Sequence, residues 1–118
     1  KELNSETMLI AMVETPAAIE SIDEIASVDG IDVIMIGTND LAMASGCPQD
    51  FGNPKIEKFY EKTALACKKY NKWLGSGGVK DEKAAKNYIE MGANFFLAGQ
   101  DIGFLLSASK DRVDRLKS

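Results

Sequence analysis

Two acidic residues stand directly after apolar runs that have the length of a β-strand. Glu14 follows the run TMLIAMV, and Asp40 closes the segment DVIMIGTND. The two carboxylates are 26 positions apart, which is the length of one strand–helix unit. Because neighbouring parallel strands end at the same edge of a sheet, both side chains should face one ligand site. Carboxylate oxygens suit hard cations, so this pattern predicts Mg2+ or Mn2+ at Glu14 and Asp40.

The turn that leads to Asp40 has the composition of an anion site. Gly37, Thr38 and Asn39 precede Asp40 near the expected start of a short helix, where backbone N–H groups attract negative groups. Glycine allows a ligand to approach the backbone closely. A 2-oxo acid fits both features, because its carboxylate suits the turn and a cation would stabilise charge on its keto oxygen. Acidic residues at strand ends also serve as solvated caps, so position alone leaves that alternative open.

Other residues whose side chains could bind a ligand or react have a simpler interpretation. Asp101 precedes the last predicted helix and is expected to be its N-cap. The segment 76–78 (Ser-Gly-Gly) is expected to follow a strand, where it either binds an anion or turns the chain. Cys67 falls on the apolar stripe of a helix, so we expect a core position for it. Cys47 lies in a predicted loop, and no neighbour in the sequence would activate its thiolate.

The composition excludes several functional classes. The 118 residues contain no histidine, so this chain carries no histidine general base, no Ser-His pair and no histidine-ligated zinc. A net charge of −4 without a basic stripe argues against a nucleic-acid partner. No apolar run approaches the roughly 20 residues that span a bilayer, so we expect no membrane segment. Two cysteines without C-x-x-C spacing indicate free thiols in a reducing compartment, and we expect the cytoplasm.

The elements that must position these residues alternate along the chain. Apolar runs of strand length predict four strands, at residues 7–13, 32–37, 73–75 and 94–98. Caps and helical periodicity predict a first helix that starts at residue 16, is closed by Asp29-Gly30 and is broken by a capping box at Ser21 and Glu24. Further helices are predicted over residues 41–45, 54–72, 81–91 and 102–116. Phe59, Tyr60 and Tyr70 share the apolar stripe of the longest helix, so we interpret them as core packing.

This order of strands and helices predicts an α/β fold with a single parallel sheet. Strands that alternate with helices are joined by right-handed crossovers, and no hairpin signal separates them. A complete (βα)8 barrel takes about 250 residues. Four βα units in residues 1–118 therefore correspond to half of such a TIM barrel.

Two segments resemble one enzyme family. The segment MVETPAAIESIDEIASVDGIDVIMIGTNDLAMASG resembles the HpcH/HpaI family of class II 2-oxo acid aldolases, which includes the 4-hydroxy-2-oxoheptanedioate and 2,4-dihydroxyhept-2-ene-1,7-dioate aldolases. The segment GANFFLAGQDIGFLLSASK resembles the final strand and helix of that family. The resemblance runs over residues 7–116 and implies the C-terminal half of the barrel. It also implies a lyase that cleaves or forms an aldol bond between a pyruvate enolate and an aldehyde.

The resemblance carries over to individual residues. Glu14 and Asp40 match the two protein ligands of the divalent metal in the family, and residues 37–40 match the turn that holds the pyruvate carboxylate. Thr38 stands where the family usually has proline, which alters the turn without excluding the site. Residues 77–79 (Gly-Gly-Val) replace apolar residues that often follow the third strand, which leaves the aldehyde specificity open.

The resemblance also predicts what lies outside these residues. The family takes its catalytic histidine and a substrate-binding arginine from the N-terminal half of the barrel. We therefore expect no catalytic base in residues 1–118 and no turnover by these residues alone. The last helix of the family is exchanged between neighbouring subunits of a hexamer, so residues 102–116 are expected to do the same in a homo-oligomer.

Two alternatives remain at this stage. The segments ETPAA and IGTNDL also resemble the phosphoenolpyruvate-binding barrel of phosphotransferases, which likewise hold a metal with Glu and Asp. Those enzymes have a cysteine after the next strand, and this chain has residues 75–77 (Gly-Ser-Gly) there. The other alternative is a non-catalytic module that binds a metal and an oxo acid, because half a barrel leaves two open sheet edges.

Overall fold

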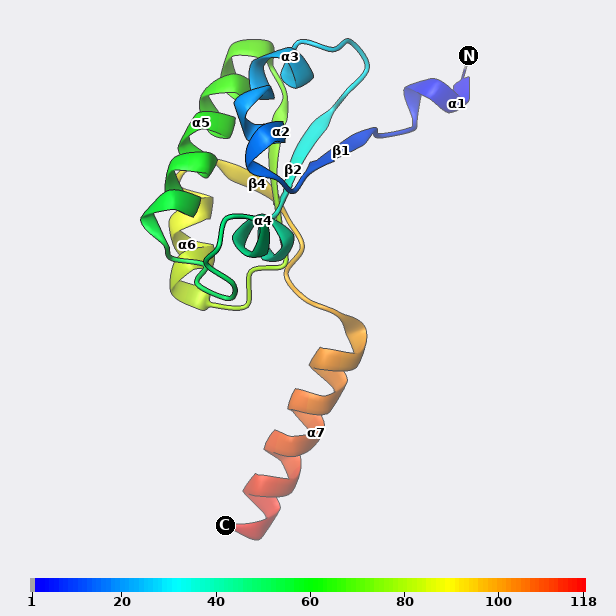
Figure 1. The fold of residues 1–118 in the computed structure, drawn as a ribbon. Coiled ribbons are helices and arrows are strands. Elements are labelled where there is room, and N and C mark those ends of the chain that lie inside the picture. Colours follow the sequence, from blue (N-terminus) through cyan, green and yellow to red (C-terminus); the bar gives the residue numbers. More distant parts are fainter. Residues whose placement is uncertain (1) are drawn as a thin grey trace.

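The computed structural model describes residues 2–118 and shows the expected alternation of strands and helices (Figure 1). One parallel sheet contains, in spatial order, β1 (Ile10–Val13), β2 (Val33–Gly37), β3 (Trp73–Gly77) and β4 (Ala93–Phe96). The helices are α1 (Glu2–Ser5), α2 (Pro16–Glu20), α3 (Ile22–Ala26), α4 (Thr38–Ala44), α5 (Pro54–Tyr70), α6 (Glu82–Glu90) and α7 (Asp101–Lys117). The predicted α/β class and parallel sheet are confirmed.

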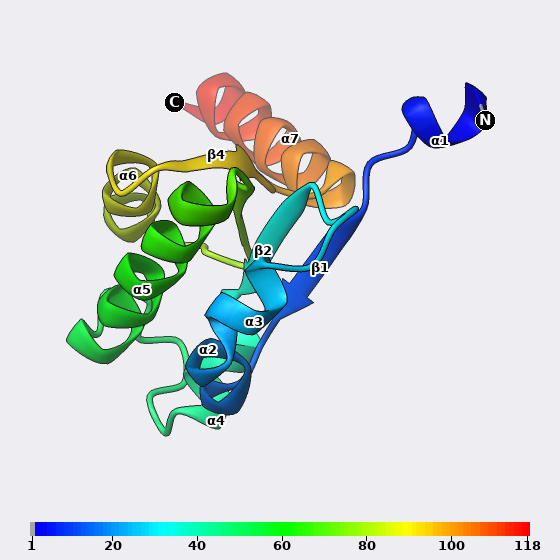
Figure 2. The same ribbon diagram turned by 90° about the horizontal axis from the view of Figure 1, so that it is seen from above.

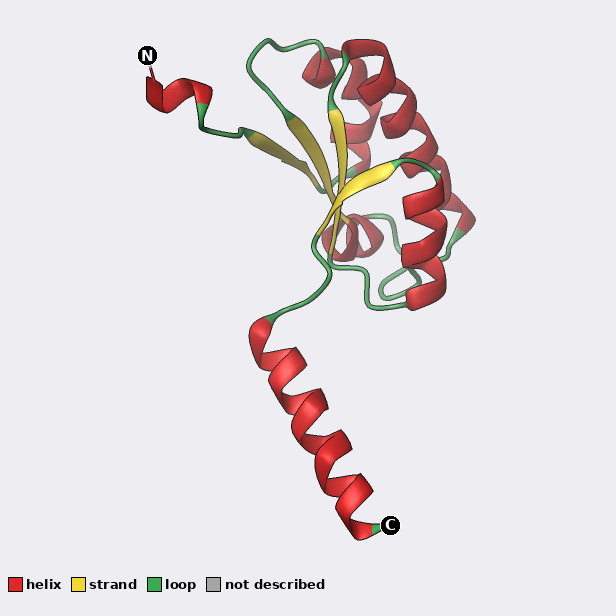
Figure 3. Ribbon diagram, turned by 180° about the vertical axis from the view of Figure 1, so that it is seen from behind, coloured by secondary structure: helices red, strands yellow, loops and turns green. Residues whose placement is uncertain are grey.

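Helices α2 to α6 cover one face of the sheet and leave the other face open (Figures 2 and 3). Ile34 and Ile36 of β2 are fully buried on the covered side, in a cluster that includes Ile56 of α5. Side chains alternate between the two faces of a strand, so Val33 and Met35 point to the open face. On that face Met12 is 54% exposed and Leu97 is 49% exposed. A closed barrel buries such a face in its interior.

The side chain of Met35 is buried on the open face because its partner in β3 is a glycine. Gly75 pairs with Met35, and a Cβ atom on Gly75 would lie 3.1 Å from both Met35 Cα and Val33 Cγ1. The side chains of β2 therefore lie over the backbone of β3. Val33 and Met35 thus pack closely against β3 on the face that would line a barrel interior.

Helix α7 projects away from the body of the molecule beyond the carboxyl ends of the strands (Figures 1 and 3). Its 17 residues include none that is buried. The radius of gyration is 16.6 Å, whereas a compact domain of this length has about 13.5 Å. The helix therefore contributes an extended arm to this chain and almost nothing to its core.

Local caps explain where several helices begin. Thr15 Oγ1 accepts a hydrogen bond from Ala18 N, and Asn53 Oδ1 accepts one from Lys55 N, as the Thr-Pro and Asn-Pro pairs indicate. The predicted break at Ser21 is confirmed, but the predicted capping box is wrong because Ser21 makes no side-chain cap bond. Its backbone has φ −89° and ψ 16°, outside the extended region that an N-cap residue normally adopts.

The predicted boundaries differ from the structure in several places. Strand β1 begins at Ile10, because Met8 and Leu9 are exposed and Leu9 N donates to the Asp32 carboxylate at 2.8 Å. Helix α4 begins at Thr38, three residues earlier than predicted, and the last strand already ends at Phe96. The first helix, α1, was not predicted. None of the helices within residues 2–118 is long and apolar enough to cross a membrane.

Candidate functional site

The carboxyl ends of β1, β2 and β3 enclose a small cavity of about 150 Å3. Glu14 follows β1 directly, and Asp40 lies in the first turn of α4, which follows β2 without a loop. The complete lining of this cavity consists of Met12, Glu14, Gly37, Asn39, Asp40, Gly77, Gly78 and Leu97. The structure thus brings Glu14 and Asp40, which are far apart in the sequence, to one cavity. Gly37 and Asn39 lie between them on its wall.

The side chain of Glu14 lies directly against the backbone of Gly37. A Cβ atom on Gly37 would be 2.6 Å from Glu14 Oε1 and 2.7 Å from Glu14 Cγ. Any other residue at position 37 would therefore displace the carboxylate. On the opposite wall, Gly78 has a φ of +78°, and its Cβ atom would lie 3.4 Å from Asn39 N. Two glycines thus allow the strand ends to close around the carboxylate.

The two carboxylates have the chemistry that a hard cation requires. Within residues 2–118, neither the Glu14 nor the Asp40 side chain takes part in a hydrogen bond or an ion pair, so their oxygens are available to a ligand. The same part of the chain contains no cluster of three or more His, Cys, Asp or Glu residues. A pair of carboxylates beside an open cavity fits Mg2+ or Mn2+, which often takes one or two protein carboxylates and completes its shell with water and substrate.

Thr38 differs from the other predicted substrate-binding residues. Its side chain is fully buried on the helix-covered side of the sheet, where Thr38 Oγ1 lies 2.6 Å from Tyr60 Oη. Only its backbone belongs to the turn that faces the cavity. The alternation of side chains explains this, because Thr38 follows Gly37, whose missing side chain would point toward Glu14.

The prediction for Ser76 is wrong. Ser76 and Gly77 are the last residues of β3, and the Ser76 side chain is fully buried. Ser76 Oγ lies 2.6 Å from Tyr60 Oη, so this hydroxyl is not available to an anion at the cavity. Tyr60 is a core residue, as predicted, but its hydroxyl also joins Thr38 to Ser76. The spacing of apolar residues along a helix contains no signal for such a polar contact.

The remaining candidates have structural roles. Asp101 is the first residue of α7 rather than its N-cap, which is Gln100, and Asp101 Oδ1 accepts a hydrogen bond from Ile102 N at 2.7 Å. Cys67 is buried in the core, as predicted, and Cys47 is partly buried against it. Phe59 and Tyr70 also pack against the core, together with Ala18, Ile25, Ile31, Ala64, Val79, Met91 and Phe96.

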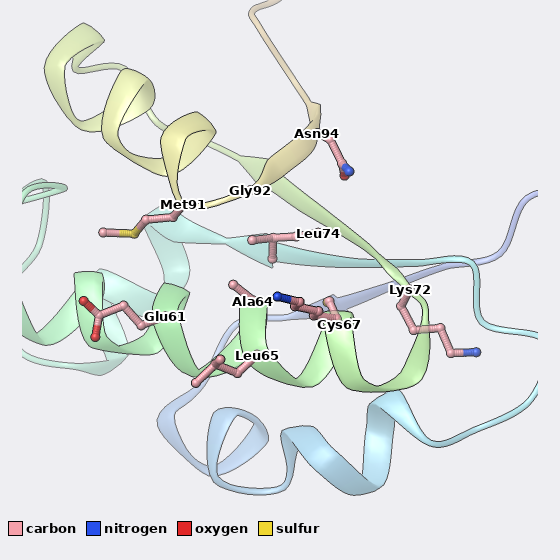
Figure 4. Close-up of a pocket in the computed structure, with 10 residues that line it drawn as sticks. Glu61, Ala64, Leu65, Cys67, Lys72, Leu74, Met91, Gly92 and Asn94 are labelled. Carbon is pink, nitrogen blue, oxygen red and sulfur yellow. The ribbon is translucent and has the colours of Figure 1, made fainter.

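A larger cavity of about 650 Å3 lies between α5 and the first residues of β4 (Figure 4). Its lining is mostly apolar and comprises Glu61, Ala64, Leu65, Cys67, Lys68, Lys72, Leu74, Met91, Gly92 and Asn94. Lys72 precedes β3, and Gly92 precedes β4, so this cavity lies at the amino ends of the strands. Barrel enzymes bind their substrates at the opposite ends, where Glu14 and Asp40 are.

The fold defines the class of architecture: one parallel sheet with strand–helix connections, as in part of a (βα)8 barrel. The chain belongs to the HpcH/HpaI aldolase/citrate lyase family, whose family model matches residues 1–108. The family predicted from the sequence is therefore confirmed. Aldolases of this family depend in general on a divalent metal.

Individual relatives are similar over nearly the whole chain. A 2-keto-3-deoxy-L-rhamnonate aldolase of Klebsiella pneumoniae is 34% identical over 117 residues, which are 99% of this chain and 43% of the relative. A 5-keto-4-deoxy-D-glucarate aldolase of the same organism is 28% identical over 97% of this chain and 44% of the relative. The solved HpcH/HpaI aldolase of Desulfitobacterium hafniense superposes with a TM-score of 0.85 at 28% identity, covering 99% of this chain and 45% of that one. The chain thus spans less than half the length of these relatives.

The buried thiol provides a test of the described core. Burial raises the pKa of the Cys67 thiol to about 11 from an ordinary value of 9.0. The folded protein therefore binds this proton more tightly than the unfolded chain does. As a consequence, the contribution of Cys67 to the free energy of unfolding falls as the pH rises from about 9 to 11. At pH 8 we expect iodoacetamide to modify Cys47 and to spare Cys67 until denaturant is added. Mass spectrometry of the labelled peptides measures both rates, and equal rates in the folded protein would contradict this core.

Proposed function

We propose that this chain supplies the metal- and pyruvate-binding half of a class II aldolase. The enzyme would cleave or form the carbon–carbon bond between the enolate of pyruvate and an aldehyde. The observation that carries the proposal is the cavity shared by Glu14, Gly37 and Asp40 at the carboxyl ends of adjacent parallel strands. The family supports the same reaction class, and the two aldolases compared above are named for keto acids.

Each wall of the cavity has a role in this mechanism. Glu14 and Asp40 would hold Mg2+ or Mn2+, which when bound supplies the Lewis acidity that stabilises negative charge on a keto oxygen. The backbone N–H groups of residues 37–40 would hold the substrate carboxylate and fix its orientation. Met12 and Leu97 supply the large apolar side chains of the lining, against which the non-polar part of a substrate would lie.

The proton transfers need a group from elsewhere in the complete barrel. The chain contains no histidine, and we assign no catalytic base to these 118 residues. A base supplied by the preceding half of the barrel would face the same mouth, because all strands of a parallel barrel end there. We also propose a cytoplasmic location, because Cys47 and Cys67 are free thiols, as is usual in a reducing compartment.

The assignment of the metal ligands is tested by replacing one carboxylate at a time. In the complete barrel, we expect Asp40→Asn and Glu14→Gln each to weaken Mn2+ binding by roughly 10-fold or more, because each removes a charged ligand. Pyruvate should bind only when the metal is present. Electron paramagnetic resonance of free Mn2+ measures the first effect, and calorimetry of pyruvate binding with and without the metal measures the second.

The matched control for these variants is Asp29→Asn, because Asp29 is exposed in a turn remote from the cavity. This variant should bind Mn2+ as the unmodified protein does. Undiminished Mn2+ affinity in Asp40→Asn would show that the cation binds elsewhere. Pyruvate binding without metal would reject the proposed role of the site.

The contact between Gly37 and Glu14 predicts a second effect. In Gly37→Ala, the new methyl group would meet the end of a flexible side chain rather than backbone, so the carboxylate should move and the fold should persist. We expect Mn2+ affinity to fall by roughly 10-fold, with little change in the unfolding midpoint. Gly52→Ala is the control, since a Cβ atom there meets nothing within 4 Å. Loss of affinity in proportion to loss of stability would refute this account.

We further propose that α7 is exchanged between subunits of a homo-oligomer, a hexamer by analogy with the family. Five exposed apolar residues form a stripe along one side of this helix, three, four, eleven and fourteen positions after the first of them: Ile102, Leu105, Leu106, Val113 and Leu116. An isolated amphipathic helix is marginally stable, so this stripe needs a partner surface. The extended position of α7 makes it accessible to a neighbouring subunit (Figure 1).

A charge in the apolar stripe of α7 tests this exchange. Leu105 is 67% exposed in the single chain, so Leu105→Glu should cost the single chain little and should disrupt contacts between subunits. We expect light scattering after gel filtration to show smaller species for this variant. Ser107→Glu places the same charge on the other side of the helix and should leave the assembly intact. An unchanged assembly in Leu105→Glu would exclude α7 as an interface.

A further inference from the structure

A chain of three buried hydroxyl groups lies immediately behind the proposed metal site. Thr38 Oγ1 and Tyr60 Oη are 2.6 Å apart, and Tyr60 Oη and Ser76 Oγ are also 2.6 Å apart. All three side chains are fully buried. They belong to three different elements, α4, α5 and β3, so the chain of hydrogen bonds ties these elements together.

Each of the two short contacts is a hydrogen bond between hydroxyl groups, in which either oxygen can donate. Thr38 Oγ1 also lies 3.4 Å from the carbonyl oxygen of Ile36, a longer contact with the backbone of β2. The series therefore joins Ser76, through Tyr60, to Thr38 at the end of β2.

The ring of Tyr60 is held firmly in this position. It stacks on the ring of Tyr88 with centroids 3.6 Å apart and an angle of 6° between the planes. The Tyr88 hydroxyl donates to the carbonyl oxygen of Phe51, which anchors the second ring to a different segment. Burial raises the pKa of Tyr60, against the opposing effect of its hydrogen bonds to Ser76 and Thr38. The Tyr60 hydroxyl group therefore remains protonated and neutral at ordinary pH.

Thr38 connects this buried chain to the cavity. It stands between Gly37, which contacts Glu14, and the residues Asn39 and Asp40 on the cavity wall. Because Thr38 has a fixed hydroxyl partner, the backbone on both sides of it has little freedom to move. Ser76 lies next to Gly77, another residue of the wall, so the same hydrogen bonds fix the opposite side of the cavity.

We propose that Tyr60 is a positioning residue, which holds the turn of residues 37–40 against the end of β3 so that Asp40 and Glu14 meet one cation. This inference rests on the proposed function, since it concerns the same metal site. Tyr60 does not line the cavity, and its hydroxyl group acts only through Thr38 and Ser76. Residues that hydrogen-bond directly to metal ligands typically change metal affinity by about 10- to 100-fold, and for Tyr60, which is one contact further from the ligands, we expect the lower end of this range.

The stacked pair of tyrosines supplies a matched comparison in the complete barrel. Tyr60→Phe removes the hydroxyl that joins Thr38 to Ser76, and Tyr88→Phe removes a buried hydroxyl from the same pair of rings without touching the turn. We expect Tyr60→Phe to weaken Mn2+ binding by roughly 10-fold. Tyr88→Phe should change it by less than about twofold, although both variants lose stability. Free Mn2+ is measured by electron paramagnetic resonance and stability by thermal unfolding.

A second pair of variants tests the same link without altering the aromatic stack. Thr38→Ser keeps the hydroxyl group and should retain Mn2+ affinity, whereas Thr38→Val removes it and should lose affinity as Tyr60→Phe does. If the unmodified protein binds Mn2+ and Tyr60→Phe or Thr38→Val binds it equally well, the positioning role is overturned. If the unmodified protein binds no Mn2+, the proposed function fails, and this inference fails with it.

Discussion

The parallel register of β1 and β2 is the constraint on which the site depends. Val13 pairs with Ile36, so the next residues along the two strands, Glu14 and Gly37, come side by side at the edge of the sheet. Side chains at paired positions point to the same face, and a glycine at one of them leaves room for the long carboxylate at the other. A shift of one residue would pair Glu14 with a side chain on the helix-covered face.

Two successive residues at the end of β2 face opposite sides of the sheet. Gly37 faces the open side, where the candidate site lies, and Thr38 faces the helices, where it meets Tyr60. The turn that carries the polar groups of the open side is therefore joined, through Thr38, to hydrogen-bonded hydroxyl groups inside the core. A buried hydrogen-bond network stabilises the fold only when every polar group in it has a partner. Each of the three hydroxyl groups here has one.

The sequence predicted the class of fold and the acid pair because both depend on local patterns. Continuous apolar runs located β2, and the two carboxylates followed from their positions at strand ends. Ser76 was misplaced because a serine between two glycines has the composition of a turn. It belongs to a buried strand that pairs with Ile36 and Phe96, and Tyr60, 16 residues earlier, supplies a partner for its buried hydroxyl. No pattern of periodicity contains that information, and the exposure of Met8 and Leu9 likewise depends on which neighbours the strand acquires.

The separation of α7 from the body of the chain has a consequence for biosynthesis. The residues that line or support the cavity lie between Met12 and Leu97, all of them before α7 in the order of translation. During translation these residues therefore leave the ribosome before α7 does. A chain whose synthesis stops before residue 101 still carries both carboxylates and the glycines beside them, whereas it lacks the helix proposed to reach a neighbouring subunit.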